Sequence, residues 1–545
     1  MDFKTFLENF DAIAEAPGGI PKLRSLILEM AVRGKLVPSN PEEREAKFDI
    51  DDIRNRVKEL EKEGRIRKQQ KALPLSEELP YRIPIKWNWV RFVDVASIES
   101  NLVKPDDFSH YPHIAPNHIE KDTGKLLQYQ TVFADEVTSP KHRFFPGQLI
   151  YSKIRPNLNK VVLVDFEGLC SADMYPISTG LYPRYLLLYM LSQTFLIQVT
   201  SSDNRLAMPK VNQDQLSQIL IAVPPLAEQK RIVEKVDELM ALCDRYEAAK
   251  QTRDNLRQKL RGSAIASLMN AETDEELDDA WAFVRDNWHN LSQQPEDADG
   301  LRKTVLQLAV RGKLVSQCSE DESASELLNR LGIKPLNSSS EKLLFALPKT
   351  WQWLDTELIA DVIDPHPSHR TPPEVRDGVP YIGMGDINKQ LEINFNDARK
   401  VSKEVFKEHT ERYALKLGDF IFGKIGTLGQ PVKLTEPFNY TLSANVVLIQ
   451  PHTKVVHSDY LYLYMTGPVM DKILSSSSRV TTHAAFGIKR MRKLPVPLPP
   501  LAEQKRIVAK VDELMKLCDQ LEASLRESQQ RAESLAASVI SHLTI

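Results

Sequence analysis

The chain has 545 residues, 42% of them hydrophobic and 27% charged, a composition typical of soluble globular proteins with several domains. No apolar run reaches the ~18 residues that a bilayer-spanning helix needs, and the N-terminus lacks the features of a secretory signal, so we expect a cytoplasmic protein without a membrane partner. The net charge of −3 argues against binding nucleic acid through bulk positive charge, and the four cysteines show no disulfide or zinc spacing.

Two pairs of repeated segments divide the chain into tandem halves. Leu23–Val37 matches Leu301–Val315, and both end in Ala-Val-Arg-Gly-Lys-Leu-Val. Residues 224–247 and 499–522 both open with Pro-Pro-Leu-Ala-Glu-Gln-Lys-Arg-Ile-Val, and only four of these twenty-four paired positions differ. The two offsets, 278 and 275 positions, are about half of the chain length, so the chain consists of two similar units.

The first repeat predicts a pair of helices in each half. A short helix, a break at Pro17 or Pro295 and a second helix precede Gly34 and Gly312, which stand where a left-handed C-cap is expected. A charged segment that we expect to be helical, 51–71, follows the first copy. A stretch that contains Ser338-Ser339-Ser340, which we expect to be a linker, follows the second copy over 316–341.

The regions between the repeats are dissimilar, and each has short β-like runs with Gly and Pro punctuation after a Trp-x-Trp sequence. They predict two mixed α/β domains of ~140–150 residues. The expected strands are Leu149–Ser152, Val161–Val164, Phe420–Gly423 and Val446–Ile449, and the expected helices lie around Tyr185–Ser192 and Tyr460–Met465.

The Pro-Pro pairs start two helices whose apolar residues recur with heptad-like spacing, and the second helix should run from ~501 to ~542. We expect the two helices to pair antiparallel, because a pseudo-twofold axis across them requires it; the alternative is that each packs on its own domain. Cys243 and Cys518 then serve as small buried hydrophobes. The seam residues are Ile232, Val236, Leu239, Cys243, Ile507, Val511, Leu514, Cys518, Leu521 and Leu525.

The predicted fold class is α+β, with two mixed α/β domains separated by a long antiparallel, coiled-coil-like helical spacer in a pseudo-twofold tandem repeat. The five expected parts are an N-terminal helical segment, a first α/β domain, a central repeated helical region with a linker, a second α/β domain and a C-terminal repeated helix. Their bounds are 1–80, 81–222, 223–345, 346–498 and 499–545.

The repeated Pro-Pro-Leu-Ala-Glu-Gln helices, the repeated Arg-Gly-Lys-Leu-Val segments and the two divergent domains resemble the specificity (S) subunit of Type I restriction-modification enzymes, over essentially the whole chain. The resemblance implies that each divergent domain is a target recognition domain reading one half of a bipartite site on double-stranded DNA. It also implies that the helices dock two methyltransferase (modification) subunits, which motor-nuclease (restriction) subunits join. A rigid spacer suits this role, because modules that read two half-sites must lie on one DNA face about one turn (~34 Å) apart.

Three segments in each domain match the family pattern and concentrate side chains suited to base edges and phosphates. In the first domain they are 111–119, 146–161 and 202–210, and in the second 380–387, 417–429 and 477–490. The predicted DNA-binding residues are Asn117, His118, Lys153, Arg155, Asn157, Asn159, Lys160, Asn204, Arg205, Lys210, Lys424, Thr427, Arg479, Thr481, Thr482, His483, Lys489 and Arg490.

Signatures of catalysis are missing from the sequence. Gly34-Lys35 and Gly312-Lys313 are followed by leucine and so are not phosphate-binding loops, both Pro-Pro sites lack the adenine methyltransferase pattern, and the histidines lack partners at metal-ligand spacing. We therefore expect a non-catalytic chain without metal or cofactor, in which S-adenosylmethionine, ATP and Mg²⁺ would be bound by partner subunits. Two alternatives remain: a single-chain nuclease with a cryptic site, and a coiled-coil scaffold that binds proteins but does not read DNA.

Overall fold

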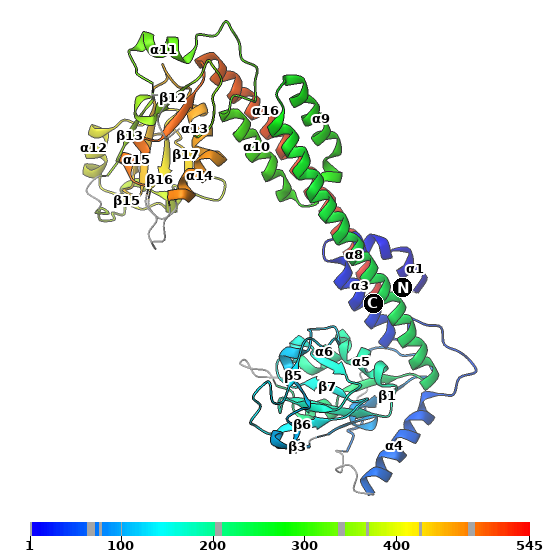
Figure 1. Ribbon diagram of the computed structural model, residues 1–545. Coiled ribbons are helices and arrows are strands. Elements are labelled where there is room, and N and C mark those ends of the chain that lie inside the picture. The colour runs from blue at the N-terminus through cyan, green and yellow to red at the C-terminus, as the bar shows by residue number, and fades with distance from the viewer. Residues whose placement is uncertain are drawn as a thin grey trace. The chain divides into compact units, whose positions relative to one another are not determined.

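The structure is a computed structural model that describes residues 3–62, 71–75, 79–99, 101–201, 210–335, 344–366, 370–424, 428–477 and 486–544 (Figure 1). The chain forms two compact units, Met1–Thr252 with Gln529–Ile545 and Arg253–Ser528. Two long helices, α8 (Leu226–Asn270) and α16 (Leu501–Thr544), each begin in one unit and end in the other, in opposite chain directions, as an antiparallel pair requires. Among the described residues, no helix is long and apolar enough to cross a bilayer.

The N-terminal repeat of unit 1 is helical, and its last helix ends on a glycine cap. Gly34 has φ +69°, its N–H bonds to the carbonyl of Ala31, and the N–H of Lys35 bonds to Met30, which is the Schellman pattern that the sequence predicts. A Cβ on Gly34 would also lie 2.4 Å from Cγ of Pro84, so glycine is required twice over. The helices are α1 (Phe3–Glu8), α2 (Phe10–Glu15), α3 (Gly19–Val32) and α4 (Ala46–Lys62).

The Pro-Pro-Leu-Ala-Glu-Gln motif joins the start of α8 to the α/β domain. Glu228 is 1% exposed and accepts a hydrogen bond from the indole Nε1 of Trp87 at 3.1 Å. Gln229 accepts from the backbone N–H of Tyr182 at 2.9 Å and donates to the carbonyl of Pro224. The polar residues of the motif are therefore buried connectors between helix and domain.

The apolar seam of α8 packs within its own unit. Its four predicted residues are at most 2% exposed and share a core with Leu23 and Ile27 of α3. Beside this core, Nη2 of Arg24 lies 2.6 Å from Oδ1 of Asp244 and 3.0 Å from Oε2 of Glu247. In unit 1 the seam thus packs against helix α3 of the first repeat. The four residues are Ile232, Val236, Leu239 and Cys243.

Three antiparallel-rich sheets form the α/β domain of unit 1, two of them in strand orders β2-β10-β7-β8 and β3-β6-β9-β4-β5, with β4 and β9 parallel. A two-stranded ladder, β1-β11, closes the domain next to α8. The strands are β1 (Asn88–Arg91), β2 (Ala96–Ile98), β3 (Leu102–Val103), β4 (Pro112–Ile114), β5 (Gln130–Thr131), β6 (Lys141–Phe144), β7 (Leu149–Ser152), β8 (Val161–Leu163), β9 (Gly168–Cys170), β10 (Met174–Thr179) and β11 (Leu220–Val223). The helices are α5 (Pro183–Leu191), α6 (Gln193–Ser201) and α7 (Gln213–Ser217).

Unit 2 repeats this plan with a different sequence. The sheet β13-β19-β16-β17 has the order of β2-β10-β7-β8, β12-β20 matches β1-β11, and β14 and β18 are parallel like β4 and β9. The strands are β12 (Gln352–Asp355), β13 (Ala360–Ile363), β14 (Val379–Ile382), β15 (Lys400–Val401), β16 (Phe420–Gly423), β17 (Gly429–Lys433), β18 (Thr441–Leu442), β19 (Val446–Pro451) and β20 (Pro495–Leu498). The helices besides α8 and α16 are α9 (Asp274–Leu291), α10 (Ala298–Val310), α11 (Ala324–Leu331), α12 (Lys403–Arg412), α13 (Ser458–Thr466), α14 (Pro468–Ser477) and α15 (Ile488–Arg492).

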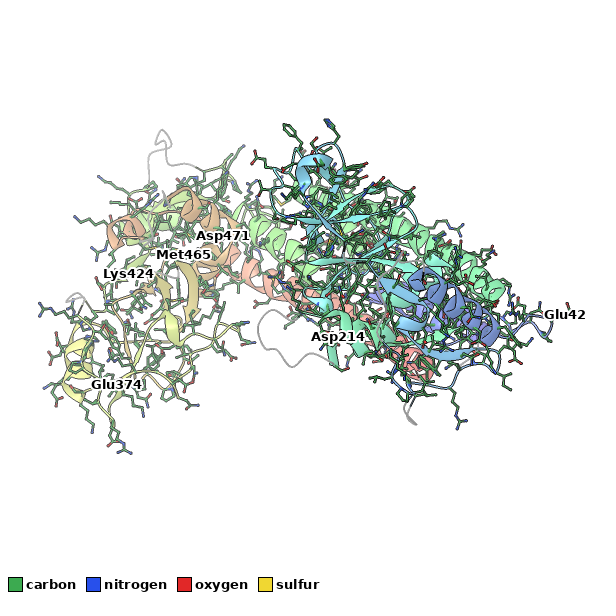
Figure 2. The ribbon with its side chains drawn as sticks, turned by 90° about the horizontal axis from the view of Figure 1, so that it is seen from below. Glu42, Asp214, Glu374, Lys424, Met465 and Asp471 are labelled. Atoms are coloured by element: carbon green, nitrogen blue, oxygen red, sulfur yellow. The ribbon has the colours of Figure 1, made fainter. Side chains whose placement is uncertain are left out.

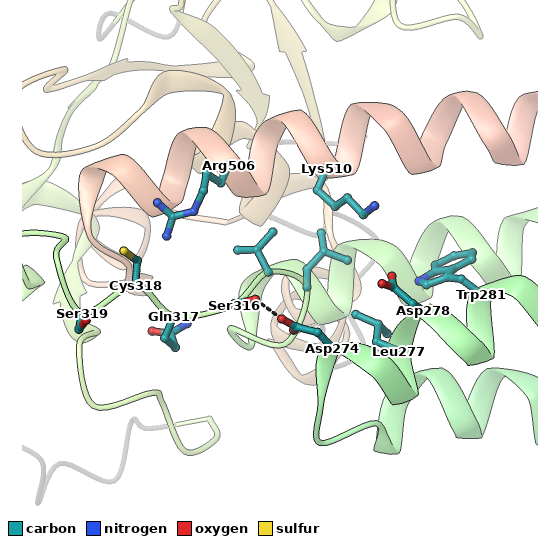
Figure 3. Close-up of a pocket in the computed structure, with 12 residues that line it drawn as sticks. Asp274, Leu277, Asp278, Trp281, Ser316, Gln317, Cys318, Ser319, Arg506 and Lys510 are labelled. Carbon is teal, nitrogen blue, oxygen red and sulfur yellow. Dashed lines mark hydrogen bonds between the residues drawn. The ribbon is translucent and has the colours of Figure 1, made fainter.

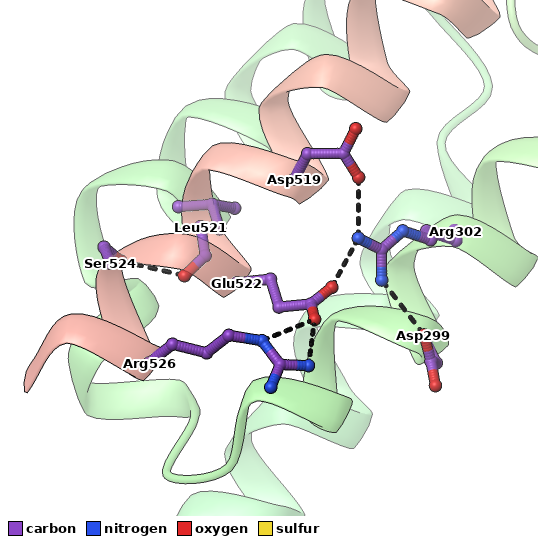
Figure 4. A network of polar contacts seen from close by, with 7 residues as sticks. All are labelled: Asp299, Arg302, Asp519, Leu521, Glu522, Ser524 and Arg526. Carbon is purple, nitrogen blue, oxygen red and sulfur yellow. Dashed lines mark hydrogen bonds and ion pairs between the residues drawn. The ribbon is translucent and has the colours of Figure 1, made fainter. Parts of the chain in front are cut away.

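The frame contacts of unit 1 recur in unit 2. Trp351 donates to Glu503 at 3.1 Å, and Gln504 accepts from the N–H of His457 at 2.6 Å. Arg302 of α10 takes the place of Arg24: its Nη2 lies 2.7 Å from Asp519 and 2.6 Å from Glu522 on α16 (Figure 4). The seam of α16 shares its core with α10 and with the end of α8. Its residues are Ile507, Val511, Leu514, Cys518 and Leu525, all buried, and the half-buried Leu521.

The stretches that follow the two copies of the first repeat each contain a helix. The charged segment expected to be helical from residue 51 begins as α4 at Ala46, whose N–H bonds to the carbonyl of Lys86, and residues 63–70 lie outside the described part. The stretch 316–341 contains α11, which the side chain of Ser323 caps through the N–H of Glu326, while the expected linker Ser338–Ser340 lies outside the described part. α4 starts on a backbone contact with a residue distant in the chain and α11 on a local side-chain cap, and composition reveals neither.

Candidate nucleic-acid interface

Backbone contacts bring the three predicted segments of the first domain together. The carbonyl of Lys153 accepts from the N–H of Val211 at 2.8 Å, and Ile154 forms an isolated bridge with Lys210. Nζ of Lys160 donates to the carbonyl of Pro116 at 2.6 Å. The segments 111–119 and 146–161 and the end of 202–210 therefore meet at one place, while residues 202–209, with the predicted Asn204 and Arg205, lie outside the described part.

Three of the predicted residues in this domain are exposed on two short 3-10 turns. Asn117 lies on the turn Pro116–His118, Asn157 lies on the turn Pro156–Leu158, and Arg155 immediately precedes the latter. Such groups can reach a ligand without disturbing the fold. Asn117, Arg155 and Asn157 are thus the exposed residues among those predicted to bind DNA in the described part of the first domain.

The other predicted residues of the first domain are engaged in holding the loops. Lys153 donates to the carbonyl of Ala172 at 2.6 Å, and its burial lowers its pKa, with a further lowering from Lys210. Lys210 forms an ion pair with Asp173 at 3.0 Å. His118 accepts a hydrogen bond at Nδ1 from the N–H of Ala115.

Asn159 was predicted to bind DNA, but it is only 1% exposed. It adopts a left-handed conformation with φ +42° at the end of the turn Pro156–Leu158. A buried side chain cannot contact a duplex, so Asn159 shapes the loop from inside. Sequence alone does not distinguish such an asparagine from an exposed one, because both suit turns.

The second domain brings its segments together in the same way. The N–H of Lys424 bonds to the carbonyl of Asn445, and its own carbonyl accepts from the N–H of Phe486 at 2.9 Å. The N–H of Ser443 bonds to the carbonyl of Ile382, which precedes the turn of segment 380–387. Segment 380–387, the described part of 417–429 and residues 486–490 thus meet around Lys424.

Lys424 itself, labelled in Figure 2, is 5% exposed, and its Nζ lies 3.0 Å from Oδ1 of Asp364. The prediction that it binds DNA is corrected: the ammonium is a buried partner of Asp364. Lys489 and Arg490 are exposed on α15, with the Arg490 guanidinium 5.1 Å from the ring centre of Phe486. The remaining predicted residues, Thr427, Arg479, Thr481, Thr482 and His483, lie outside the described part.

A buried histidine cluster in the second domain was not predicted. Nδ1 of His409 lies 2.6 Å from Oγ1 of Thr441, which also lies 2.9 Å from Oη of Tyr413. The ring of His366 packs edge-on against His409, with centroids 4.8 Å apart. Burial lowers the pKa of His409 to about 4, with a further lowering from His366. The described residues contain no group of three or more His, Cys, Asp or Glu that could hold a metal ion.

A pocket of about 660 Å³ lies in the helical frame of unit 2, away from these loops (Figure 3). Leu277 and Trp281 of α9 form part of its lining, and Arg506 and Lys510 of α16 lie across from them. Arg506 is engaged with Asp321 at 2.7 Å. The pocket shares no residue with the three segments of the second domain, so it is separate from the candidate interface.

Comparison with known proteins gives consistent matches. The family model for the Type I restriction modification DNA specificity domain matches residues 84–253 and again 368–529. The chain is 29% identical over 550 residues to the Type I restriction enzyme EcoEI specificity subunit of Escherichia coli, covering 95% of this chain and 93% of that protein. It is 48% identical over 172 residues to the EcoDI specificity subunit of Escherichia coli, covering 32% of this chain and 38% of that protein.

A solved structure from a study of complex assembly and conformational transition of the type I R-M system has a similar fold. It aligns with a TM-score of 0.50 and 20% sequence identity, over 85% of this chain and 99% of that chain. The first family match contains the α/β domain of unit 1 and the first part of α8, and the second contains the strands β14 to β20 of unit 2 and the first part of α16.

Proposed function

The chain belongs to the Type I restriction-modification DNA specificity family, and on this premise we propose that each unit reads one half of a bipartite, asymmetric DNA site. The observation that carries the proposal is the combination of two nearly identical frames with two unlike sets of loop side chains. The frames repeat the Trp–Glu, Gln and Arg contacts almost residue for residue. The converging loops expose Asn117, Arg155 and Asn157 in one unit and Lys489 and Arg490 in the other.

Within this proposal the chain acts in the cytoplasm by binding alone. The repeated frames support a symmetric role, in which each unit docks one of two methyltransferase subunits and α8 and α16 set the spacing between half-sites. S-adenosylmethionine would be held by the methyltransferase subunits, and ATP and Mg²⁺ by motor-nuclease subunits. The net charge of −3 fits a chain whose partners supply much of the phosphate contact that dominates affinity.

The proposal is tested by purifying the chain alone and with its methyltransferase subunits. We expect no methyl transfer and no cleavage by the chain alone, and methylation at one bipartite sequence by the complex, mapped by sequencing of methylated adenines. Metal-dependent cleavage by the lone chain would instead support a cryptic nuclease. Binding of partner subunits with equal affinity for every duplex would support a protein scaffold without DNA readout.

A further inference from the structure

The turn between β7 and β8 has an unusual backbone. Arg155 (φ +49°, ψ +58°) and Asn159 (φ +42°, ψ +55°) are both left-handed and flank the 3-10 turn Pro156–Leu158. In this region the Cβ of any L-residue approaches the following carbonyl; asparagine tolerates it because its short side chain can hydrogen-bond locally, whereas arginine is rarely found there. Such residues persist only where the surrounding structure holds them, and they concentrate at functional sites.

The surroundings hold this turn from both ends. The N–H of Ser152 bonds to the carbonyl of Lys160 at 2.9 Å, and the N–H of Lys153 bonds to the carbonyl of Asp173 at 3.0 Å. Within the turn, the N–H of Leu158 bonds back to the carbonyl of Arg155 at 2.9 Å. Pro156 and Asn159 are buried beneath it. The direction of the Arg155 Cα–Cβ bond is therefore fixed by the fold.

The three neighbouring lysines that the structure describes are occupied by protein groups. Lys153 donates to Ala172, Lys160 donates to Pro116, and Lys210 is paired with Asp173. Arg155 is exposed, and in the part of the chain that the structure describes no hydrogen bond or ion pair engages its guanidinium. Among the described residues at the meeting point of the loops, Arg155 is thus the cation whose backbone direction is fixed while its guanidinium stays available.

We propose that Arg155 determines specificity in the first recognition domain by reading a guanine of its half-site in the major groove. This inference rests on the proposed function. The planar guanidinium matches the O6 and N7 acceptors of guanine in a bidentate contact, the commonest specific contact to that base. A phosphate contact needs only a flexible positive charge, whereas a base contact needs a fixed approach, which the constrained turn provides. The lysines around Arg155 hold the loop and are not readers.

The test uses the complete complex with its methyltransferase subunits and measures competition between the cognate site and sites with one base pair changed at a time. With the unaltered chain, we expect the complex to discriminate against a changed base pair at one G·C position of the first half-site, the position that Arg155 reads. Arg155→Ala should reduce discrimination at that position by roughly 5- to 150-fold and leave the other positions and the second half-site unchanged. Arg155→Lys keeps the positive charge but loses the planar guanidinium that makes the bidentate contact, so discrimination at this position should fall to the same extent.

Arg155→Gly separates recognition from folding, because glycine adopts the left-handed conformation without strain. This variant should assemble and unfold like the unaltered chain, yet lose the same discrimination. Lys104→Ala, which removes an exposed cation of the same domain outside the three loops, is the matched control and should keep full discrimination.

Two results would overturn the inference. Unchanged discrimination in Arg155→Ala would show that Arg155 does not read a base, and equal weakening on all sites in Arg155→Ala and Arg155→Gly would show a phosphate contact. Failure of the proposed function is distinguishable, since the unaltered complex would then show no preference at the first half-site at all.

Discussion

At the residue scale, the repeated motif is explained by buried hydrogen bonds. Glu228 and Glu503 are at most 1% exposed, and burial raises the pKa of each carboxyl while the tryptophan indole lowers it. The sequence showed both the Glu-Gln pairs and the tryptophans at 87 and 351, but not that they touch. That contact joins residues 141 positions apart in the first unit and 152 in the second, so no local pattern reports it.

Removing one of these carboxylates should destabilise its unit. Glu503→Leu leaves a buried donor, Nε1 of Trp351, without its acceptor, whereas the exposed Gln317 can turn its amide to solvent. A buried unpaired donor costs about 1–3 kcal/mol, so we expect a clear fall in the free energy of unfolding measured by urea titration. Glu513→Leu, at an exposed position of the same helix, is the control and should change stability by no more than about 0.5 kcal/mol. Equal effects of the two substitutions would contradict this account.

The histidine cluster predicts a pH dependence of stability. The folded-state pKa of His409 is about 4, below its value of ~6.5 in an unfolded chain, so between these values the unfolded state binds more protons. Stability should therefore be fully present above pH ~6.5 and decline as the pH falls towards 4, by on the order of 2 kcal/mol at pH 5. Thermal unfolding at pH 7.5 and 5.0 measures the effect. In His409→Gln, which cannot acquire this charge, the decline should be smaller; a decline of the same size would exclude His409 as its source.

At the element scale, the sequence predicted individual strands and helices well but did not predict which elements pack together. The strands at 149–152 and 420–423 match the prediction, as does the second long helix, because short apolar runs bounded by turn residues and heptad spacing are local signals. The partner of the α8 seam was not fixed by its spacing, because an apolar stripe suits any complementary face. The burial of Lys424 and Asn159 likewise depends on neighbours distant in the chain.

The candidate site was predictable as loops but not as individual contacts. Its three segments per domain were found from the sequence, and backbone bonds at Lys153 and Lys424 bring them together. Which polar groups remain exposed is decided by ion pairs such as Lys210–Asp173 and Lys424–Asp364. These pairs join different segments, so residue type alone does not separate an anchor from a reader.

The long helices supply a prediction about spacing. Four residues inserted after Thr252 and four after Ser528, at the bounds of the two units, add about 6 Å to each helix. If the helices set the spacer, the unread gap between half-sites should grow by about two base pairs while both half-sites stay the same. Mapping methylated adenines measures this directly. An unchanged gap would mean that the helices do not set it.

The position of the insertion matters for this experiment. An insertion after Met240, which the helical repeat alone would permit, falls between Leu239 and Cys243, two residues of the seam buried against α3. It should therefore weaken unit 1 rather than lengthen the spacer, and a lower unfolding temperature would reveal that. The same reasoning applies to Met515, between Leu514 and Cys518.

At the scale of the whole molecule, each domain should be exchangeable within its frame. β1 pairs with β11, and Trp87 bonds to Glu228, so the natural limits of an exchange lie inside these contacts, at Phe92 and Ile219. Replacing 92–219 by the matching segment of another family member should change one half-site only. Methylation mapping checks this, and a change in both half-sites would contradict independent readout.

The glycine caps limit where genes of this family can recombine. Gly34 fits under Pro84 and Gly312 under Pro348, with no room for even a methyl group in either place. Each pair joins stretches that are separate in the gene but inseparable in space. A recombination event that brings in a new recognition domain without a proline at this position keeps the glycine cap but loses its packing partner. Viable recombination should therefore break the chain upstream of the proline or well beyond the tryptophan that follows it.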